Sequence, residues 1–196
     1  MSNKRKTALV VCPGRGTYNA DELGYLARHH AAKQAYLELV DRDRASQSQE
    51  QVSALDGRKK FAASVHTRGD NASALINACA YCDFLDIDRD SYEIVAVTGN
   101  SLGWYIALGC ADVVTEMDAA RLVNTMGTLM QRKLNGGQLI YPLFDENWRP
   151  IAGRAEALEA LRQQAQIETG GRQIRLHGIT CGSGRDMRAT VARLQP

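Results

Sequence analysis

The sequence lacks long apolar runs, a strong charge of one sign and a paired set of cysteines, and each absence excludes a class of protein. No apolar run approaches the roughly 20 residues that a membrane-spanning helix requires. The N-terminus passes from charged residues into the apolar run 7–12, which is too short for the core of a signal peptide. The formal net charge is +2, and the single basic cluster, residues 4–6, lies at the terminus. We therefore expect a cytoplasmic protein that contacts neither membrane nor nucleic acid.

The cysteines argue against a disulfide framework and against a metal site. They number five, an odd count, and lie dispersed in apolar surroundings. Cys79 and Cys82 have the Cys-x-x-Cys spacing of redox and metal pairs, but they fall in an expected helix, 71–85, without glycine or proline. We interpret the pair as small buried apolar residues, and we expect no metal and no bound cofactor.

The order of the expected elements predicts an α/β fold for residues 1–135. The apolar runs 7–12 and 92–98 each end in a glycine-containing turn, which is typical of parallel strands buried on both faces. Helices are expected at 21–40, 71–85, 102–110 and 116–134. The polar segment 41–60 is either an exposed helix or a mobile connection. Strands that alternate with helices favour a parallel sheet.

From residue 136 the pattern changes to that of a small separate lobe, 136–196. Strands are expected at 138–144 and 173–180, a turn at 145–150, and helices at 153–168 and 185–194. A β-α-β-α lobe needs one more strand to cover its last helix. We therefore expect the chain to stop short of a complete lobe.

One segment has the spacing of a catalytic nucleophile. Gly99-Asn100-Ser101-Leu102-Gly103 follows an apolar strand directly and precedes a helix directly. Glycines on both sides of a serine permit a sharp turn that leaves the hydroxyl exposed, and the N–H of Leu102 is a candidate oxyanion-hole donor. The alternative is a structural turn whose serine only caps the helix.

Three segments together carry a family resemblance. Residues 99–105 resemble the Gly-His-Ser-Leu-Gly-Glu-Tyr turn of malonyl-CoA:acyl-carrier-protein transacylases and polyketide acyltransferase domains. Residues 13–16 are similar to that family's Pro-Gly-Gln-Gly loop, and residues 120–131 to its Arg-Leu-Val…Arg-Gly-Glu-Leu-Met-Gln helix. The resemblance spans nearly the whole chain but only the first two thirds of the family's domain. It implies an α/β-hydrolase-like core and a ferredoxin-like small lobe, the latter incomplete here.

The resemblance implies acyl transfer through a covalent intermediate. Ser101 would take the acyl group from an acyl-CoA, the substrate, and pass it to the thiol of an acyl carrier protein, the partner. The backbone N–H groups of Leu102 and Arg15 would form the oxyanion hole. The acyl pocket would be lined by Asn100, Trp104, Met126 and Gln131.

Four positions or segments depart from the family pattern, and the first three bear on specificity. Met126 stands where the family has an arginine that pairs with the malonate carboxylate, so a neutral acyl group fits the local chemistry better, unless Met126 is only a core residue. Arg15 replaces a glutamine; its guanidinium either contacts a carboxylate or a CoA phosphate, or lies in solvent. Asn100 and Trp104 replace a histidine and a glutamate and alter the pocket wall.

The fourth departure is the catalytic base, because the resemblance places the family's histidine just beyond a strand that this chain is expected to lack. Adjacent His29 and His30 are expected on the surface, and His66 is expected to be structural or exposed. His177, in the segment that the resemblance assigns to the cleft, is a weak substitute. A second chain that completes the small lobe is one source of the missing base.

Two other functions stay open. A distinct serine hydrolase or thioesterase would pair Ser101 with His177 and an aspartate such as Asp112 or Asp145. A non-catalytic partner module of a fatty-acid or polyketide system would instead use its uncovered sheet edge to bind another chain. We predict an acyltransferase.

Overall fold

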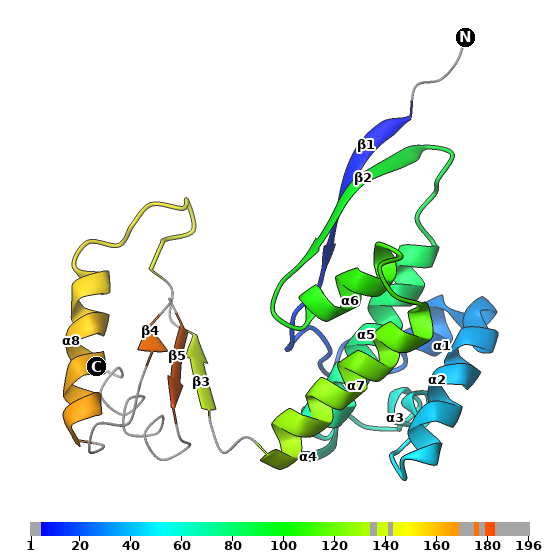
Figure 1. Ribbon diagram of the computed structural model, residues 1–196, viewed down its shortest axis with the longest axis horizontal. Coiled ribbons are helices and arrows are strands. Elements are labelled where there is room, and N and C mark those ends of the chain that lie inside the picture. The colour runs from blue at the N-terminus through cyan, green and yellow to red at the C-terminus, as the bar shows by residue number, and fades with distance from the viewer. Residues whose placement is uncertain (1–4, 134–136, 141–142, 169–174, 177–178, 183–196) are drawn as a thin grey trace. The chain divides into compact units, whose positions relative to one another are not determined.

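The computed structural model describes residues 5–133, 137–140, 143–168, 175–176 and 179–182. The chain divides into two compact units, Met1–Lys133 and Leu134–Pro196 (Figure 1). Within the described ranges, no helix is both long and apolar enough to cross a lipid bilayer.

Two parallel strands organise the first unit. Strand β1 (Lys6–Cys12) pairs with β2 (Tyr92–Gly99), from Lys6 opposite Tyr92 to Cys12 opposite Gly99. This confirms the predicted parallel sheet. Because Cys12 and Gly99 are paired last residues of parallel strands, the loop after β1 and the turn after β2 leave the sheet at the same edge. The predicted serine turn and the predicted Pro-Gly loop therefore meet in space.

Helices make up most of the remaining first unit (Figure 1). The predicted helix 21–40 is interrupted at His30, whose φ of −124° is not helical. In chain order the helical elements are α1 (Tyr25–His29), the 3-10 turn η1 (Ala31–Lys33), α2 (Gln34–Ser46), α3 (Val52–Asp56), α4 (Ala63–His66), α5 (Gly69–Leu85), α6 (Gly103–Cys110) and α7 (Glu116–Lys133).

The polar segment 41–60 is packed into the fold, which excludes the mobile connection. The Asp41 carboxylate accepts hydrogen bonds from the N–H groups of Val52 (2.6 Å) and Ser53 (3.2 Å) and so caps α3. Arg44 is 1% exposed and donates to the side-chain oxygens of Asn71 (2.8 Å) and Asn124 (2.7 Å). Its guanidinium thereby ties α2 to α5 and α7.

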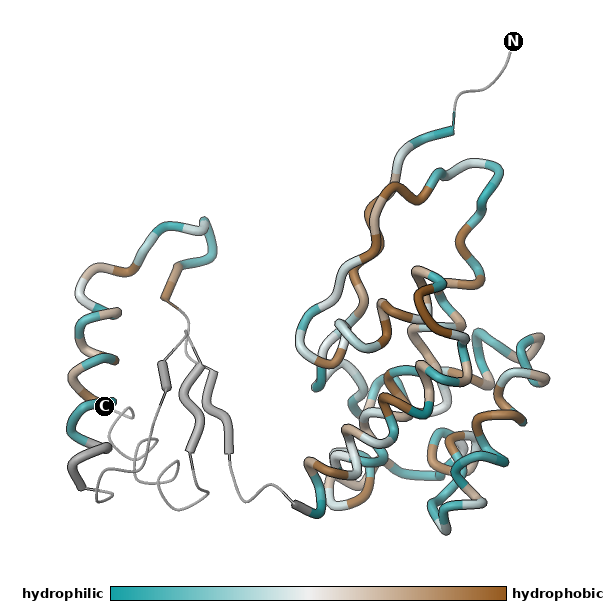
Figure 2. The backbone as a smooth tube through the Cα atoms, viewed as in Figure 1, coloured by the Kyte–Doolittle hydropathy of each residue, from teal (hydrophilic) through white to brown (hydrophobic). Residues whose placement is uncertain are grey.

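The described residues cover the sheet on one face, which corrects the expectation of strands buried on both faces. Helix α6 packs against both strands. Leu9, Val11 and Val95 are 59%, 61% and 60% exposed. In Figure 2, hydrophobic residues are distributed along β1, β2 and α6. The apolar composition of these segments therefore predicted correctly that they are strands, but it did not predict that one face of the sheet is exposed.

Helices α5 and α7 approach closely because both carry glycine at their contact. A Cβ added to Gly127 would lie 2.5 Å from the carbonyl oxygen of Gly69, and one added to Gly69 would lie 2.8 Å from that of Gly127. The Gln131 side chain also accepts a hydrogen bond from the Gly69 N–H (2.9 Å). This contact fixes the C-terminal half of α7 against the start of α5.

In the second unit, the described residues form a three-stranded antiparallel sheet and one helix. The strand order is β3-β5-β4, with β3 at Gly137–Ile140, β4 at Arg175–Leu176 and β5 at Ile179–Gly182. Helix α8 spans Arg154–Glu168, as predicted within one residue. The single strand expected at 173–180 is wrong, because β4 and β5 pair with each other in antiparallel fashion. The helix expected at 185–194 lies outside the described residues.

Candidate active site

Ser101 lies at the turn between β2 and α6 in a left-handed backbone conformation. Its φ is 53°, and its side chain is exposed. This conformation costs a residue with a Cβ about 1–3 kcal/mol and persists only where the surroundings impose it. No side chain caps α6, so the alternative that Ser101 merely caps the helix is not supported. Ser48, Asp112 and Trp148 also have positive φ, so the conformation alone does not mark the site.

Two glycines impose the turn at Ser101. A Cβ on Gly99 would lie 2.1 Å from the carbonyl carbon of Gly103, and one on Gly103 would lie 2.2 Å from the carbonyl oxygen of Cys12. Neither position can hold a side chain unless the backbone moves. The glycines of the Gly-x-Ser-x-Gly pattern therefore serve close backbone packing, while the serine between them stays accessible.

The early loop, residues 13–18, is held against this turn. The Asn100 N–H donates to the carbonyl oxygen of Cys12 (3.1 Å), and a Cβ on Gly14 would lie 2.9 Å from the carbonyl oxygen of Asn100. Within the loop, the Thr17 hydroxyl donates to the carbonyl oxygen of Gly14 (3.1 Å). Arg15, one of the two predicted oxyanion-hole residues, is thus adjacent to a residue that touches Asn100.

A buried hydrogen bond anchors the far end of the early loop. Tyr18 is buried, and its hydroxyl donates to the Asp56 carboxylate (2.6 Å). The other oxygen of this carboxylate accepts from the Leu26 N–H (3.1 Å). Burial, together with this bond to Asp56, raises the pKa of Tyr18 well above its ordinary value. The tyrosine stays protonated, so the anchor persists across physiological pH.

The Arg15 side chain reaches helix α7. Its Nη1 lies 3.6 Å from the Sδ of Met130, a residue that is 39% exposed. Met126, one helical turn earlier, is half-buried. These methionines share one face of α7, because residues four apart on a helix are neighbours.

The other predicted acyl-pocket residues differ in whether their side chains already form hydrogen bonds. Trp104 is 60% exposed on the first turn of α6, and Asn100 is exposed beside Gly14. Gln131 is also exposed, but its side-chain oxygen is already engaged by the start of α5. Leu102, the second predicted oxyanion-hole residue, is buried directly after Ser101.

The prediction that His30 is a surface residue is wrong. Its ring is 3% exposed, and its Nε2 and Nδ1 lie 2.9 and 3.0 Å from carboxylate oxygens of Asp83 and Asp86. His30 lies between α1 and η1, outside regular helix. His29 is exposed as expected and packs against the ring of Tyr25, with centroids 4.6 Å apart.

His66 is a structural histidine, one of its two expected roles. It is completely buried, and its Nε2 lies 3.1 Å from the carbonyl oxygen of Leu55. Because a carbonyl only accepts, Nε2 carries the proton, and Nδ1 accepts from the Ala62 N–H (3.0 Å). His177 lies outside the described residues. Within the described ranges, therefore, no histidine forms a hydrogen bond with Ser101.

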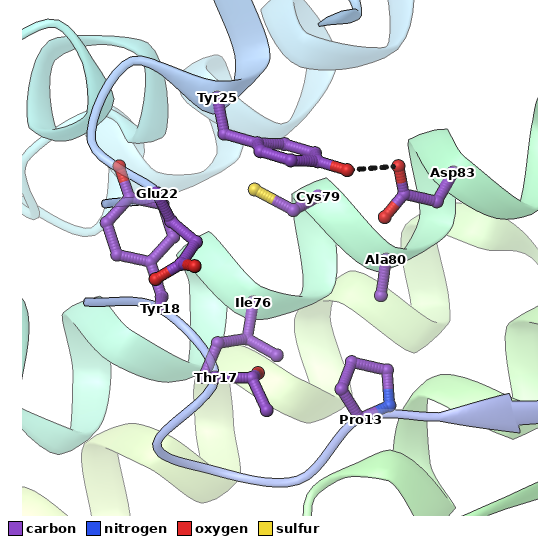
Figure 3. Close-up of a pocket in the computed structure, with 9 residues that line it drawn as sticks. All are labelled: Pro13, Thr17, Tyr18, Glu22, Tyr25, Ile76, Cys79, Ala80 and Asp83. Carbon is purple, nitrogen blue, oxygen red and sulfur yellow. Dashed lines mark hydrogen bonds between the residues drawn. The ribbon is translucent and has the colours of Figure 1, made fainter. Parts of the chain in front are cut away.

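A pocket of about 270 Å³ lies between the early loop and α5 (Figure 3). Tyr25 crosses above Cys79 there, and its hydroxyl donates to Asp83 (3.0 Å). Ser101 does not line this pocket. The lining residues are Pro13, Thr17, Tyr18, Glu22, Tyr25, Ile76, Cys79, Ala80 and Asp83.

Of the two cysteines of α5, Cys82 is buried, as the sequence predicted, and Cys79 is partly buried. Burial raises the pKa of Cys82 to about 12, and burial followed by the charge of Asp56 raises that of Cys79 further. Thiols that stay protonated are poor nucleophiles and poor metal ligands. In the part of the chain that is described, no cluster of histidine, cysteine and carboxylate side chains could hold a metal ion.

The aspartates considered for a hydrolase have different surroundings. The Asp145 carboxylate is used in its own turn, where it accepts from the N–H groups of Asn147 (2.8 Å) and Arg149 (2.9 Å). Asp112 is exposed after α6 with a φ of 53°. No described histidine forms a hydrogen bond with either carboxylate.

Comparison with known proteins gives a match in structure alone. No protein-family model matches the sequence, and no curated protein matches it significantly. Among solved structures, the acyl-carrier-protein S-malonyltransferase of Bartonella henselae has 23% sequence identity and a TM-score of 0.68, over 95% of this chain and 58% of that one. The malonyl transacylase PlMCAT, solved with the type II polyketide-synthase acyl-carrier protein AntF, has 19% identity and a TM-score of 0.69, over 94% and 57%.

A third match is the MCAT of Mycobacterium tuberculosis, with 17% identity and a TM-score of 0.66, over 95% of this chain and 59% of that one. The chain thus spans less than two thirds of each of these structures. Identities this low establish a shared fold and not a shared activity. The chain has the fold of the malonyl-CoA:acyl-carrier-protein transacylases.

Proposed function

We propose that this protein is an acyltransferase that moves an acyl group from CoA to an acyl carrier protein through an ester on Ser101. The observation that carries the proposal is the turn itself. Ser101 is exposed at a φ of 53° between two glycines that have no room for a side chain, at the beginning of α6. Helix N-termini favour developing negative charge, so the turn suits an attack on a carbonyl.

In the proposed reaction the Ser101 hydroxyl attacks the thioester carbonyl. The C–S bond breaks, CoA leaves as a thiol that takes up the serine proton, and an ester remains. The carrier thiol then attacks the ester, giving the acyl carrier thioester and restoring the hydroxyl. The N–H groups of Leu102 and Arg15 would stabilise the oxyanion in both steps. The acyl pocket would be formed by Asn100, Trp104, Met126 and Gln131.

The finer fold assignment belongs to this proposal. Two parallel strands, the second of which leads into the serine turn, support an α/β-hydrolase-like core for the first unit. Antiparallel strands with one helix support a ferredoxin-like lobe for the second. A carrier protein as partner is supported by the structure of PlMCAT with AntF. The cytoplasmic location stays a prediction.

The mechanism requires a base that accepts the Ser101 proton. Neither His30 nor His66 is free, because the ring nitrogens of each are engaged elsewhere. We assign the base either to His177, as a weak candidate, or to a second chain that completes the small lobe. If neither supplies it, the chain alone is inactive.

Intact-mass measurement tests the proposal. The protein is mixed with acetyl-CoA, malonyl-CoA and longer acyl-CoAs, beside Ser101→Ala. Ser48→Ala is the matched control, since Ser48 is exposed at a φ of 57° without the glycine frame. We expect one added acyl group in the parent and in Ser48→Ala, and none in Ser101→Ala. An adduct that survives Ser101→Ala contradicts the proposal, and no adduct from folded protein favours the non-catalytic partner module.

A further inference from the structure

Two buried cysteines lie side by side where β1 and α6 end. Cys12, the last residue of β1, and Cys110, the last residue of α6, are 3% and 5% exposed. Their Sγ atoms are 3.9 Å apart, although the residues are 98 positions apart in the sequence. We propose that this pair is a site of reversible oxidation, at which a hydroperoxide converts the two thiols into a disulfide. The inference does not depend on the proposed function, because the acyl transfer uses neither cysteine.

The distance between the two sulfurs suits a disulfide. The S–S bond of a disulfide is about 2.05 Å long, so the Sγ atoms of Cys12 and Cys110 must approach by about 1.9 Å. Rotation of a cysteine side chain between its rotamers moves the sulfur by a comparable distance. The bond can therefore form without a large displacement of β1 or α6.

The two thiols differ in acidity. Hydrogen bonding with Cys110 lowers the pKa of Cys12 below its ordinary value, although burial acts in the opposite direction. The same bond, followed by burial, raises the pKa of Cys110. Because the thiolate is the reacting form of cysteine, Cys12 is the sulfur that a peroxide should oxidise first.

The proposed oxidation has two steps, and hydrogen peroxide is an oxidant small enough for sulfurs this far buried. The Cys12 thiolate attacks one oxygen of the peroxide, the O–O bond breaks, and hydroxide leaves a sulfenic acid on Cys12. The Cys110 thiol then attacks this sulfur. Its proton leaves with the hydroxyl group as water, and the S–S bond forms. Together the two sulfurs lose two electrons, which reduce the peroxide.

The disulfide would cross-link the two elements that hold the serine turn. The carbonyl oxygen of Cys12 accepts a hydrogen bond from the Asn100 N–H (3.1 Å), and a Cβ on Gly103 would lie 2.2 Å from it. The first residue of α6 thus already touches Cys12, and oxidation would fasten the last residue of α6 to it as well. A cross-link between residues 98 positions apart restricts the unfolded chain strongly, so the oxidised protein should be more stable.

Counting of free thiols tests the inference on the full chain. Folded protein is treated with hydrogen peroxide, denatured and alkylated with iodoacetamide, and its mass is measured before and after digestion. We expect two of the five cysteines to escape alkylation, and a cross-linked peptide that joins Cys12 to Cys110. Dithiothreitol should reverse both results. The cross-linked peptide is sought in the parent protein, so this result does not depend on the folding of any variant.

Two variants separate the proposed pair from the other thiols. Cys110→Ala should form no disulfide and should retain a sulfenic acid on Cys12, which dimedone traps. Cys79→Ala is the matched control, because Cys79 is a partly buried thiol outside the pair, and it should form the same cross-link as the parent. Urea denaturation measures the effect on stability. Oxidation should raise the midpoint of the parent by roughly 1 M and leave that of Cys110→Ala unchanged.

Several outcomes would overturn the inference. Alkylation of all five cysteines after peroxide treatment would show that the folded pair does not react. A cross-link between other cysteines, or oxidation of Cys12 to sulfinic acid without a cross-link, would equally reject the proposed site. A cross-link that forms only in urea would show that the fold does not bring the two sulfurs together. A cross-link without a rise in the urea midpoint would retain the site and reject its stabilising effect.

Discussion

Replacing Ser101 by glycine and by alanine should invert the usual order of stability of these two residues. At ordinary helical positions alanine is more stable than glycine by about 0.5–1 kcal/mol, because glycine loses more backbone freedom on folding. At Ser101 the backbone is left-handed, with a φ of 53°. There an L-residue incurs roughly 1–2 kcal/mol of steric strain that glycine avoids.

The balance of these two effects gives the expected magnitude. Strain of roughly 1–2 kcal/mol exceeds the entropic advantage of alanine, so Ser101→Gly should be more stable than Ser101→Ala by about 0.5–1 kcal/mol. Ser48, at a φ of 57°, should show the same sign. Ser53, an exposed residue of α3, should show the opposite sign.

Urea denaturation of the six variants, followed by far-UV circular dichroism, measures these differences as free energies of unfolding. The comparison within each pair cancels the loss of the serine hydroxyl. If alanine is more stable than glycine at position 101 as well as at position 53, the backbone at Ser101 is not held in the left-handed conformation. The structural argument for the serine turn would then fail.

Three other substitutions test the surrounding structure. Gly103→Ala places a Cβ 2.2 Å from the carbonyl oxygen of Cys12 and should lower the free energy of unfolding by roughly 1–3 kcal/mol. The urea midpoint should fall accordingly, and an unchanged midpoint would contradict the close packing. Arg44→Met leaves the buried oxygen atoms that accept hydrogen bonds from the guanidinium without a donor. It should lower the free energy of unfolding by roughly 3–5 kcal/mol in the same assay, and a loss below about 1 kcal/mol would show that the network is dispensable. Burial opposes ionisation of Asp70, but hydrogen bonds from Arg68 hold its pKa below the ordinary 3.8. The resulting stability should be complete above that pH and fade as pH falls through the lowered pKa. Arg68→Gln should move acid unfolding to higher pH, and an unmoved acid transition argues against the pair.

Local sequence patterns were sufficient to predict the serine turn. Its glycines and its flanking strand and helix are all contained in residues 92–110, so no distant contact is needed to recognise them. The parallel direction of β1 and β2 also followed from sequence, because apolar strands separated by helices favour parallel sheets. The contact between the early loop and Asn100 then follows from where these strands end.

Features that depend on tertiary partners could not be predicted. The burial of Arg44 depends on two asparagines, Asn71 and Asn124, that are distant in sequence. The buried ring of His30 likewise contacts two distant residues, Asp83 and Asp86. The exposed face of β1 was missed because an apolar strand reads the same whether one or both faces are covered. The approach of Arg15 to Met130 joins residues 115 positions apart, and no local signal predicts it.

Transfer of a labelled acyl group in a single turnover tests the central claim most directly. The protein is loaded from acyl-CoA, separated from excess donor and mixed with an acyl carrier protein, and the masses of both proteins are followed. The account predicts that the acyl mass leaves Ser101 and appears on the carrier, with neither step in Ser101→Ala. Release of the acyl group as free acid, with the carrier unchanged, would instead identify a hydrolase and contradict the proposed acyl transfer.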